Sequence, residues 1–305
     1  MNQVVYALLP LCLAAVYFYG WRFILVLAVV NGIGFLSEYL FVRKNKQPVS
    51  SAVFVTSFIF ALSLPPTIPL WIASVGIAFG IVFGKMVFGG FGRNVFNPAV
   101  SGRAFIYISF GVPLTSGFTP AVPGAAGGFT AWQPAVDAIT KATPLVKMAQ
   151  GETISTLTLF LGKHAGSFGE TSAILVLLCG LFLIIKKTAS YQIVLSGIAG
   201  FLLLQSLFYF GGVEQAAHPV QGLLAGTILF GIFFMATDPV SASQTTTGGK
   251  WIYGAMIGLL TSLIRTFSVW SEGFTFALLI ANMFAPLLDH VMKTLKKRKK
   301  EVVKA

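Results

Sequence analysis

The chain has 305 residues, of which 56% are apolar and only 10% are charged, and its mean hydropathy is +0.83. Because a soluble domain carries about 25% charged residues, this composition excludes an ordinary soluble protein and indicates a polytopic membrane protein. The net charge of +12 does not indicate a nucleic-acid partner. The basic residues lie in short runs beside apolar segments, as in cytoplasmic loops and in segments that bind anionic lipid.

About ten apolar segments follow one another along the chain, and a full membrane span needs about 20 residues. The third segment is short and ends in the proline-rich run Leu64–Pro69, which cannot continue as a helix. The fifth is also short and opens with Asn97-Pro98. Helices broken at membrane depth usually line a cavity or a site. The segments are approximately residues 4–19, 22–42, 50–64, 68–88, 97–111, 168–185, 191–211, 219–236, 252–268 and 273–292.

The basic runs predict how the segments cross the membrane. They lie at residues 43–46, at Lys186-Lys187 and in the tail from Lys293 to Lys300. Short basic loops beside spans mark the cytoplasmic side, and every run agrees with one alternating topology. We therefore predict a multi-pass protein of the inner (plasma) membrane with both termini in the cytoplasm.

A weak internal repeat divides the chain. Residues Phe96–Ser101 resemble Thr237–Ser241, and each stretch follows an apolar run punctuated by glycines. The alternating topology gives the two halves opposite orientations, and inverted repeats with broken helices place a site between them. Chance similarity between two glycine-rich helices is the alternative. The predicted organisation is a first membrane repeat (1–111), an extracytoplasmic loop (112–167), a second membrane repeat (168–292) and a basic cytoplasmic tail (293–305).

Several long motifs in a fixed order carry a resemblance to a known family. They are Ser63–Trp71, Gly89–Ala99, Gly166–Ser172, Phe234–Ser243 and Ala281–His290. Through them the chain resembles the family that unites the B-type membrane component of the Na+-translocating NADH:quinone oxidoreductase with the D-type membrane component of the Rnf complex. The resemblance implies an all-α fold of two inverted five-helix repeats, similar to urea channels. It also implies two flavins, a covalent FMN and a non-covalent riboflavin.

In this family a phosphoester joins FMN to a threonine in an Asp-x-x-Ser/Thr-Gly-Ala-Thr stretch. The matching positions are Asp137, Thr140, Ala142 and Thr143, which makes Thr143 the implied attachment residue. Lys141 stands where the family has glycine, and its ammonium group could help to neutralise the flavin phosphate. The alternative is that Thr143 is an ordinary loop threonine.

Residues at the start of the fifth segment are candidate flavin neighbours. Asn97, Ser101 and Arg103 open a half-helix, whose free N–H groups can face anions or polar rings. Helix capping and contacts between helices are the alternative roles. The glycine-rich stretch Gly89–Gly92 lies between membrane segments and lacks the strand–turn–helix context of a dinucleotide site. We therefore expect a partner protein of the complex to oxidise NADH or ferredoxin.

Ionisable residues near the spans are candidates for an ion path, because such groups are costly in lipid. The resemblance implies roles for Asp238 and Asp289 in sodium uptake. Asp238 together with Ser241 or Thr237 would supply the oxygen ligands that a hard cation prefers. Capping of a helix before Pro239 is the alternative for Asp238, and exposure to lipid headgroups is the alternative for Asp289. Glu38 could pair with a neighbouring helix.

These observations predict a membrane flavoprotein subunit of an ion-translocating (Na+ or H+) electron-transfer complex. The chain would relay electrons through FMN and riboflavin towards quinone, with other membrane and flavin subunits and a flavin transferase as partners. Residues Ser50–Ala52 replace an Asn-Glu-Gly-like stretch that, in the Na+-translocating members of the family, is tied to quinone and ion uptake. The alternatives are a urea-channel-like transporter and a scaffold subunit, both without a redox role. The transporter does not explain the stretch from Asp137 to Thr143, whereas Lys141, in place of the family's glycine, keeps the scaffold alternative open.

Overall fold

The computed structural model is α-helical throughout the part of the chain that it describes. That part is residues 1–305 except 44, 45, 123, 135–142, 153, 163, 244, 269–272 and 305, and the side chains of 149 and 298–304 are not described. The described residues form fourteen α-helices, one π-helical turn and one 3-10 turn. The predicted all-α class is confirmed.

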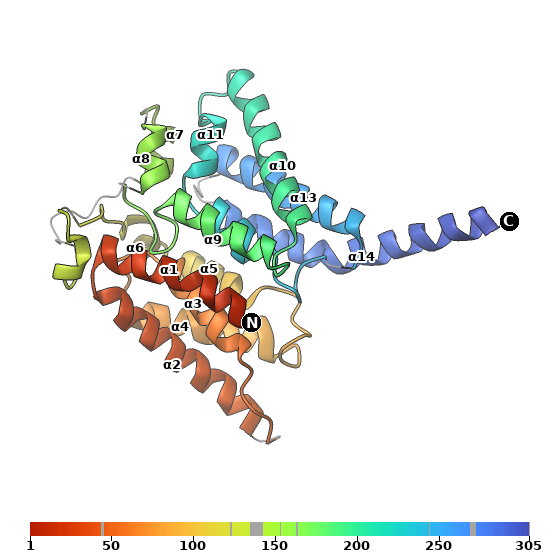
Figure 1. Cartoon of the computed structure of the whole chain (residues 1–305), viewed down its shortest axis with the longest axis horizontal. Coiled ribbons are helices and arrows are strands. Elements are labelled where there is room, and N and C mark those ends of the chain that lie inside the picture. The colour runs from red at the N-terminus through yellow and green to blue at the C-terminus, as the bar shows by residue number, and fades with distance from the viewer. Residues whose placement is uncertain are drawn as a thin grey trace.

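The first half of the chain forms one side of a helical bundle (red to orange in Figure 1). Its helices are α1 (Asn2–Tyr19), α2 (Arg22–Val42), α3 (Ala52–Leu62), α4 (Leu70–Ile81) and α5 (Pro98–Ser109), with the π-helical turn η2 (Val82–Met86) continuing α4. As the prolines predict, α3 ends before Pro65 and α5 begins directly at Pro98.

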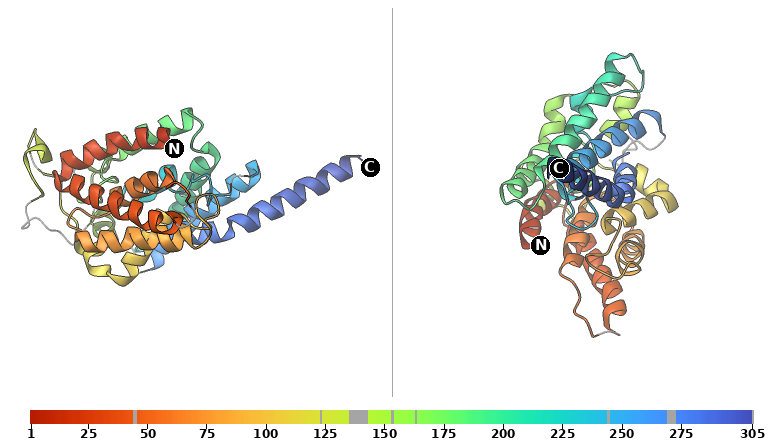
Figure 2. Two further views of the ribbon diagram at one scale, coloured as in Figure 1. Left: turned by 90° about the horizontal axis from the view of Figure 1, so that it is seen from below. Right: turned by 90° about the vertical axis from the view of Figure 1, so that its right-hand side faces the viewer.

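The second half forms the other side of the bundle (green to blue in Figure 1). Its helices are α9 (Ala173–Ile185), α10 (Tyr191–Phe210), α11 (Pro219–Leu224), α12 (Ile228–Phe234), α13 (Thr247–Phe267) and α14 (Phe274–Lys304). Two helices occupy the predicted apolar segment 219–236, because Gly226 adopts φ +69 and separates α11 from α12. The end of α14 projects from the bundle, as Figure 1 and the left view of Figure 2 show.

Short elements connect the two halves. They are α6 (Gly111–Ser116), η3 (Gly127–Thr130), α7 (Pro144–Ala149) and α8 (Thr156–Leu161). A small separate core joins α7 and α8 to α11, with Met148, Leu159 and Ala225 buried at its centre. This core fixes the segment after Thr143 against the second half of the bundle.

Among the described residues, four helices are long and apolar enough to cross a membrane: α1, α2, α10 and residues Phe274–Lys297 of α14. The stretches Ala52–Leu62, Leu70–Met86 and Ala173–Ile185 are apolar but shorter. Large apolar side chains such as Leu13, Leu203 and Phe210 are exposed on the outside of the bundle, as expected for a surface that faces lipid. The chain is a multi-pass membrane protein.

Glycines allow pairs of helices to approach closely in both halves. A Cβ atom at Gly102 of α5 would lie 2.4 Å from the carbonyl oxygen of Gly76 in α4. A Cβ atom at Gly258 of α13 would lie 2.1 Å from the carbonyl oxygen of Gly197 in α10. Small residues at such contacts are a common means of packing membrane helices. The contact between Gly76 and Gly102 holds α5 close to α4, and the contact between Gly197 and Gly258 holds α13 close to α10.

Candidate functional site

Two pockets lie near opposite ends of α5. The inner pocket has a volume of about 190 Å³ and lies where α5 begins, beside the ends of η2 and α12. Its polar wall includes Thr56, Lys85, Asn94, Asn97, Thr188, Thr237 and Asp238, and its apolar wall includes Val55, Ile59, Phe91, Leu183, Phe233 and Phe234. The pocket therefore combines aromatic surface with hydrogen-bonding groups of both signs of charge.

Asn97 caps α5 and holds it against the second half of the chain. Its Oδ1 accepts a hydrogen bond from the backbone N–H of Ala99 at 3.0 Å, and Pro98 occupies the first helical position. Its Nδ2 donates to the backbone oxygen of Met235 at 3.2 Å. The capping role is therefore observed, and the residue also lines the inner pocket.

Asn282 of α14 is the partner that sequence reasoning missed. Its Oδ1 accepts from the backbone N–H of Asn97 at 3.1 Å. Its Nδ2 donates to the backbone oxygen of Ser241 at 3.1 Å and lies 2.6 Å from the hydroxyl of Tyr253. One fully buried amide thus joins α5, α13, α14 and the segment after α12. An asparagine inside an apolar run was the available signal.

The two aspartates of the predicted ion path accept hydrogen bonds from different serines. Asp238 Oδ2 accepts from the backbone N–H of Ser241 at 3.0 Å and from its hydroxyl at 2.6 Å. Asp289 Oδ1 accepts from the hydroxyl of Ser243 at 2.6 Å. The interpretation of Asp238 as a helix cap is wrong, because the residues after it form a turn and α13 begins at Thr247. Asp238 lines the inner pocket, whereas Asp289 does not.

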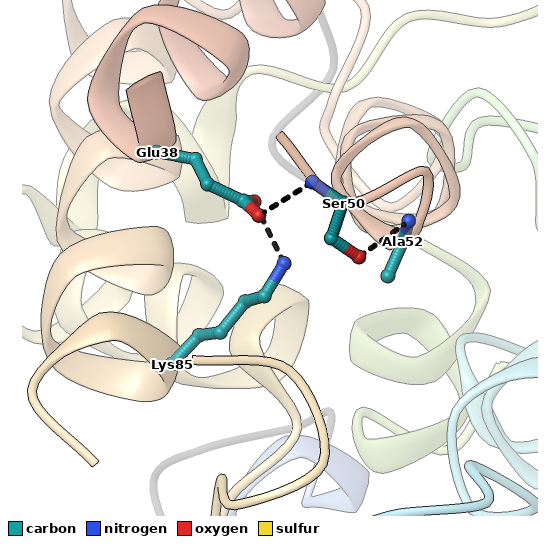
Figure 3. A network of polar contacts seen from close by, with 4 residues as sticks. All are labelled: Glu38, Ser50, Ala52 and Lys85. Carbon is teal, nitrogen blue, oxygen red and sulfur yellow. Dashed lines mark hydrogen bonds and ion pairs between the residues drawn. The ribbon is translucent and has the colours of Figure 1, made fainter. Parts of the chain in front are cut away.

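Lys85, on the wall of the inner pocket, forms a buried ion pair with Glu38 (Figure 3). Lys85 Nζ is 2.7 Å from Glu38 Oε2, and each side chain is 2% exposed. The other carboxylate oxygen of Glu38 accepts from the backbone N–H of Ser50 at 2.9 Å. The expected pairing of Glu38 with a neighbouring helix is confirmed. Its partner was missed, although a lysine inside the apolar segment 68–88 was a visible signal.

The outer pocket is larger, with a volume of about 410 Å³. It is lined by Tyr107 at the end of α5, by Leu114–Ser116 and Phe118, by Thr143–Val146 and by His164–Ser167 with Glu170 and Gly226. Thr143 is half-buried and caps α7, with its hydroxyl oxygen 3.5 Å from the backbone nitrogen of Val146. The predicted neighbours Asp137, Thr140, Lys141 and Ala142 lie outside the described residues.

The three candidate flavin neighbours on α5 do not share one pocket. Asn97 faces the inner pocket, while the Ser101 hydroxyl donates to the backbone oxygen of Asn97 at 3.0 Å and lines neither pocket. Arg103 is buried and lies 3.5 Å from Glu170, a residue of the outer pocket. The periodicity of the helix explains this separation, since successive residues of α5 point to different sides.

His164 adds a titratable group to the outer pocket. Its Nδ1 lies 3.0 Å from the backbone oxygen of Ala165. Burial lowers the pKa of His164, because desolvation disfavours the charged imidazolium. The ring is therefore neutral at physiological pH and offers the pocket a polar group without charge.

Comparison with known proteins connects this arrangement to a family. Residues 1–297 match the NQR2, RnfD, RnfE family. The chain is 42% identical over 290 residues to the B subunit of the Na(+)-translocating NADH-quinone reductase of Ectopseudomonas mendocina (strain ymp), a match that covers 90% of this chain and 68% of that protein. It is 39% identical over 295 residues to the protein of the same name from Neisseria meningitidis serogroup B, covering 91% and 68%. The B subunit from Azotobacter vinelandii is 40% identical over 290 residues, which cover 90% of this chain and 68% of that protein.

Proposed function

Because the chain belongs to the NQR2, RnfD, RnfE family, we propose that it is the membrane flavoprotein subunit of an ion-translocating oxidoreductase complex. In this proposal it relays electrons through a covalent FMN and a non-covalent riboflavin towards quinone. When bound, a flavin accepts and passes one or two electrons, and the protein supplies position and electrostatics. The single observation that carries the proposal is that Thr143 borders a pocket of about 410 Å³.

The outer pocket fits a flavin joined to Thr143. Its volume lies within the roughly 300–1,000 Å³ typical of ligand pockets. Tyr107 and Phe118 provide aromatic surface for a ring, and Ser167 and Glu170 provide polar atoms at its edge. Thr143 is half-buried rather than enclosed, so part of the residue remains exposed to a transferase.

The inner pocket fits the polar and aromatic needs of riboflavin. Phe91 and Phe233 supply aromatic faces, and Asn94 and Asn97 can donate and accept hydrogen bonds at ring heteroatoms. At about 190 Å³ the pocket is smaller than most ligand sites, so this chain would enclose only part of the flavin. A partner protein of the complex would cover the remainder.

The path between the pockets follows α5. Pro98 borders the inner pocket and Tyr107 borders the outer one. At 1.5 Å of rise per residue these positions are about 14 Å apart along the helix. The same 12-residue helix therefore contributes to the walls around both proposed flavins.

Ion movement is assigned to the inner side. Asp238 borders the inner pocket, and its carboxylate with the Ser241 hydroxyl forms an oxygen-rich pair suited to Na+. Asp289 would act at a separate step, since it contacts Ser243 instead. With both termini in the cytoplasm, the inner pocket would open towards that side and the outer pocket towards the periplasm or cell exterior. NADH or ferredoxin would be oxidised by a partner.

In-gel fluorescence of the denatured chain, co-expressed with its flavin transferase, tests the proposal. The parent band should fluoresce, the Thr143→Ala band should be dark, and the Thr115→Ala band should fluoresce. Thr115 is a matched control because it borders the same pocket. A dark parent band, with the transferase active on another substrate, would overturn covalent FMN and favour a transporter or a scaffold subunit.

A further inference from the structure

Lys85 is a buried cation on the wall of the inner pocket. The whole residue is 1% exposed, and it lines the pocket together with Asn94 and Asn97. A buried ion pair is often no more stabilising than apolar residues of the same volume. Stability alone therefore does not account for a charged group at this position.

A π-helical turn aims Lys85 into this position. Residues Val82–Met86 form η2, in which the backbone N–H of Val87 donates to the oxygen of Val82 at 2.9 Å. This turn accommodates one residue more than an α-helical turn would. Such turns occur frequently at functional sites, where they redirect a side chain.

The ammonium group of Lys85 has hydrogen-bonding capacity to spare. It carries three donors, and among the described residues Glu38 Oε2 is its one hydrogen-bond acceptor. The Phe91 ring lies 5.8 Å from Nζ and supplies a cation–π contact. Glu38 is itself fixed by the backbone N–H of Ser50. The pair thus holds the ammonium group in place while leaving N–H groups for a ligand.

The pocket meets only one end of this pair. Lys85 lines the pocket and Glu38 does not, so the ligand is nearer to the positive charge. Asp238 brings a carboxylate to the same pocket, but its Oδ2 already accepts two hydrogen bonds from Ser241. The pocket is therefore polarised, with a hydrogen-bond donor of positive charge at Lys85.

We infer that Lys85 donates a hydrogen bond to an acceptor atom of the flavin ring in the inner pocket and favours the reduced, more electron-rich ring over the oxidised one. Glu38 is a positioning residue that holds Lys85. This inference rests on the proposed function. No bond to Lys85 forms or breaks, because the electrons come from the outer flavin and the ammonium group keeps its protons.

The test is a spectroelectrochemical titration of the purified complex, recorded as variant minus parent. Lys85→Met should reduce about tenfold the preference of the inner pocket for reduced riboflavin over oxidised riboflavin, which is the size expected for the loss of a charged hydrogen-bond donor. For a two-electron couple this is a fall of about 30 mV in midpoint potential. The double variant Lys85→Met/Glu38→Gln should show the same fall without leaving a buried carboxylate unpaired. Lys85→Arg should leave the potential unchanged, as should the control Lys250→Met, because Lys250 of α13 does not line the inner pocket.

The outcomes separate this inference from the proposed function. A parent complex that releases no riboflavin on denaturation would overturn the inner flavin site, and the inference with it. Retained riboflavin with an unchanged potential in both charge-removing variants would overturn only the inference. A shift in Lys85→Met that disappears in the double variant would assign the effect to Glu38. Loss of riboflavin from both variants but not from Lys85→Arg would support the contact with the ring, whereas loss from all three, with FMN kept on Thr143, would overturn the inference and leave the pair a structural role.

Discussion

Removing the Asn282 amide should destabilise the protein severely. Asn282→Leu keeps a similar volume and deletes the contacts to Asn97, Ser241 and Tyr253. The first two are buried backbone groups, each costing about 1–3 kcal/mol when left without a partner. Allowing for partial relaxation, we expect a loss of about 3–5 kcal/mol. At roughly 2 °C per kcal/mol for a chain of this size, the Tm should fall by about 6–10 °C.

The assay is thermal unfolding of the purified protein in lipid nanodiscs, with Asn31→Leu as the matched control. Asn31 is also an asparagine in an apolar helix, but its Nδ2 donates to Leu27 of its own helix at 2.8 Å. Replacing Asn31 breaks a hydrogen bond within one helix rather than between helices, so the Tm of Asn31→Leu should differ from that of the parent by less than about 2 °C. Equal falls in the two variants, or no fall in Asn282→Leu, would refute the assignment of Asn282 as the residue that joins the two halves.

Two further predictions follow from close packing and from burial. Gly258→Ala should separate α10 from α13 and cost about 2 kcal/mol or more, while Gly32→Ala, which meets nothing within 4 Å, should not reduce the Tm. Because burial lowers the pKa of His164, the unfolded chain binds more protons than the folded one below its ordinary pKa of about 6.5. The Tm should therefore fall as the pH decreases below about 6.5, and His164→Gln should flatten this dependence. A pH profile identical in parent and variant would contradict the assignment.

The order and extent of the helices could be predicted because they depend on local sequence. Each of the ten predicted apolar segments contains an α-helix. Proline placed two of the breaks, at Pro65 and Pro98, since it cannot continue a helix and is favoured at the first helical position. Gly226 was not recognised as a break, because one of several glycines spaced along an apolar segment gives no signal of its own backbone conformation.

The contacts that build the pockets could not be predicted, because they join residues far apart in the chain. Asn97 and Asn282 are 185 positions apart, and Arg103 and Glu170 are 67 apart. No local pattern gives the register in which such segments meet. The single polar residues inside apolar segments were nevertheless visible. If each had been expected to have a hydrogen-bonding or ionic partner on another helix, Lys85 would have been identified as a candidate.

The two pockets are linked through one short helix that is anchored at its start and in its middle. Asn97 ties the start of α5 to α14, and Arg103 ties its middle to Glu170 on the outer pocket. Twelve residues packed through glycine against α4 leave little room for α5 to bend. A change in ligand or charge at one pocket that moves α5 must therefore also alter the wall of the other. In the proposed function, electron transfer along α5 and ion binding at Asp238 would therefore share one mechanical element, without requiring the two sites to touch.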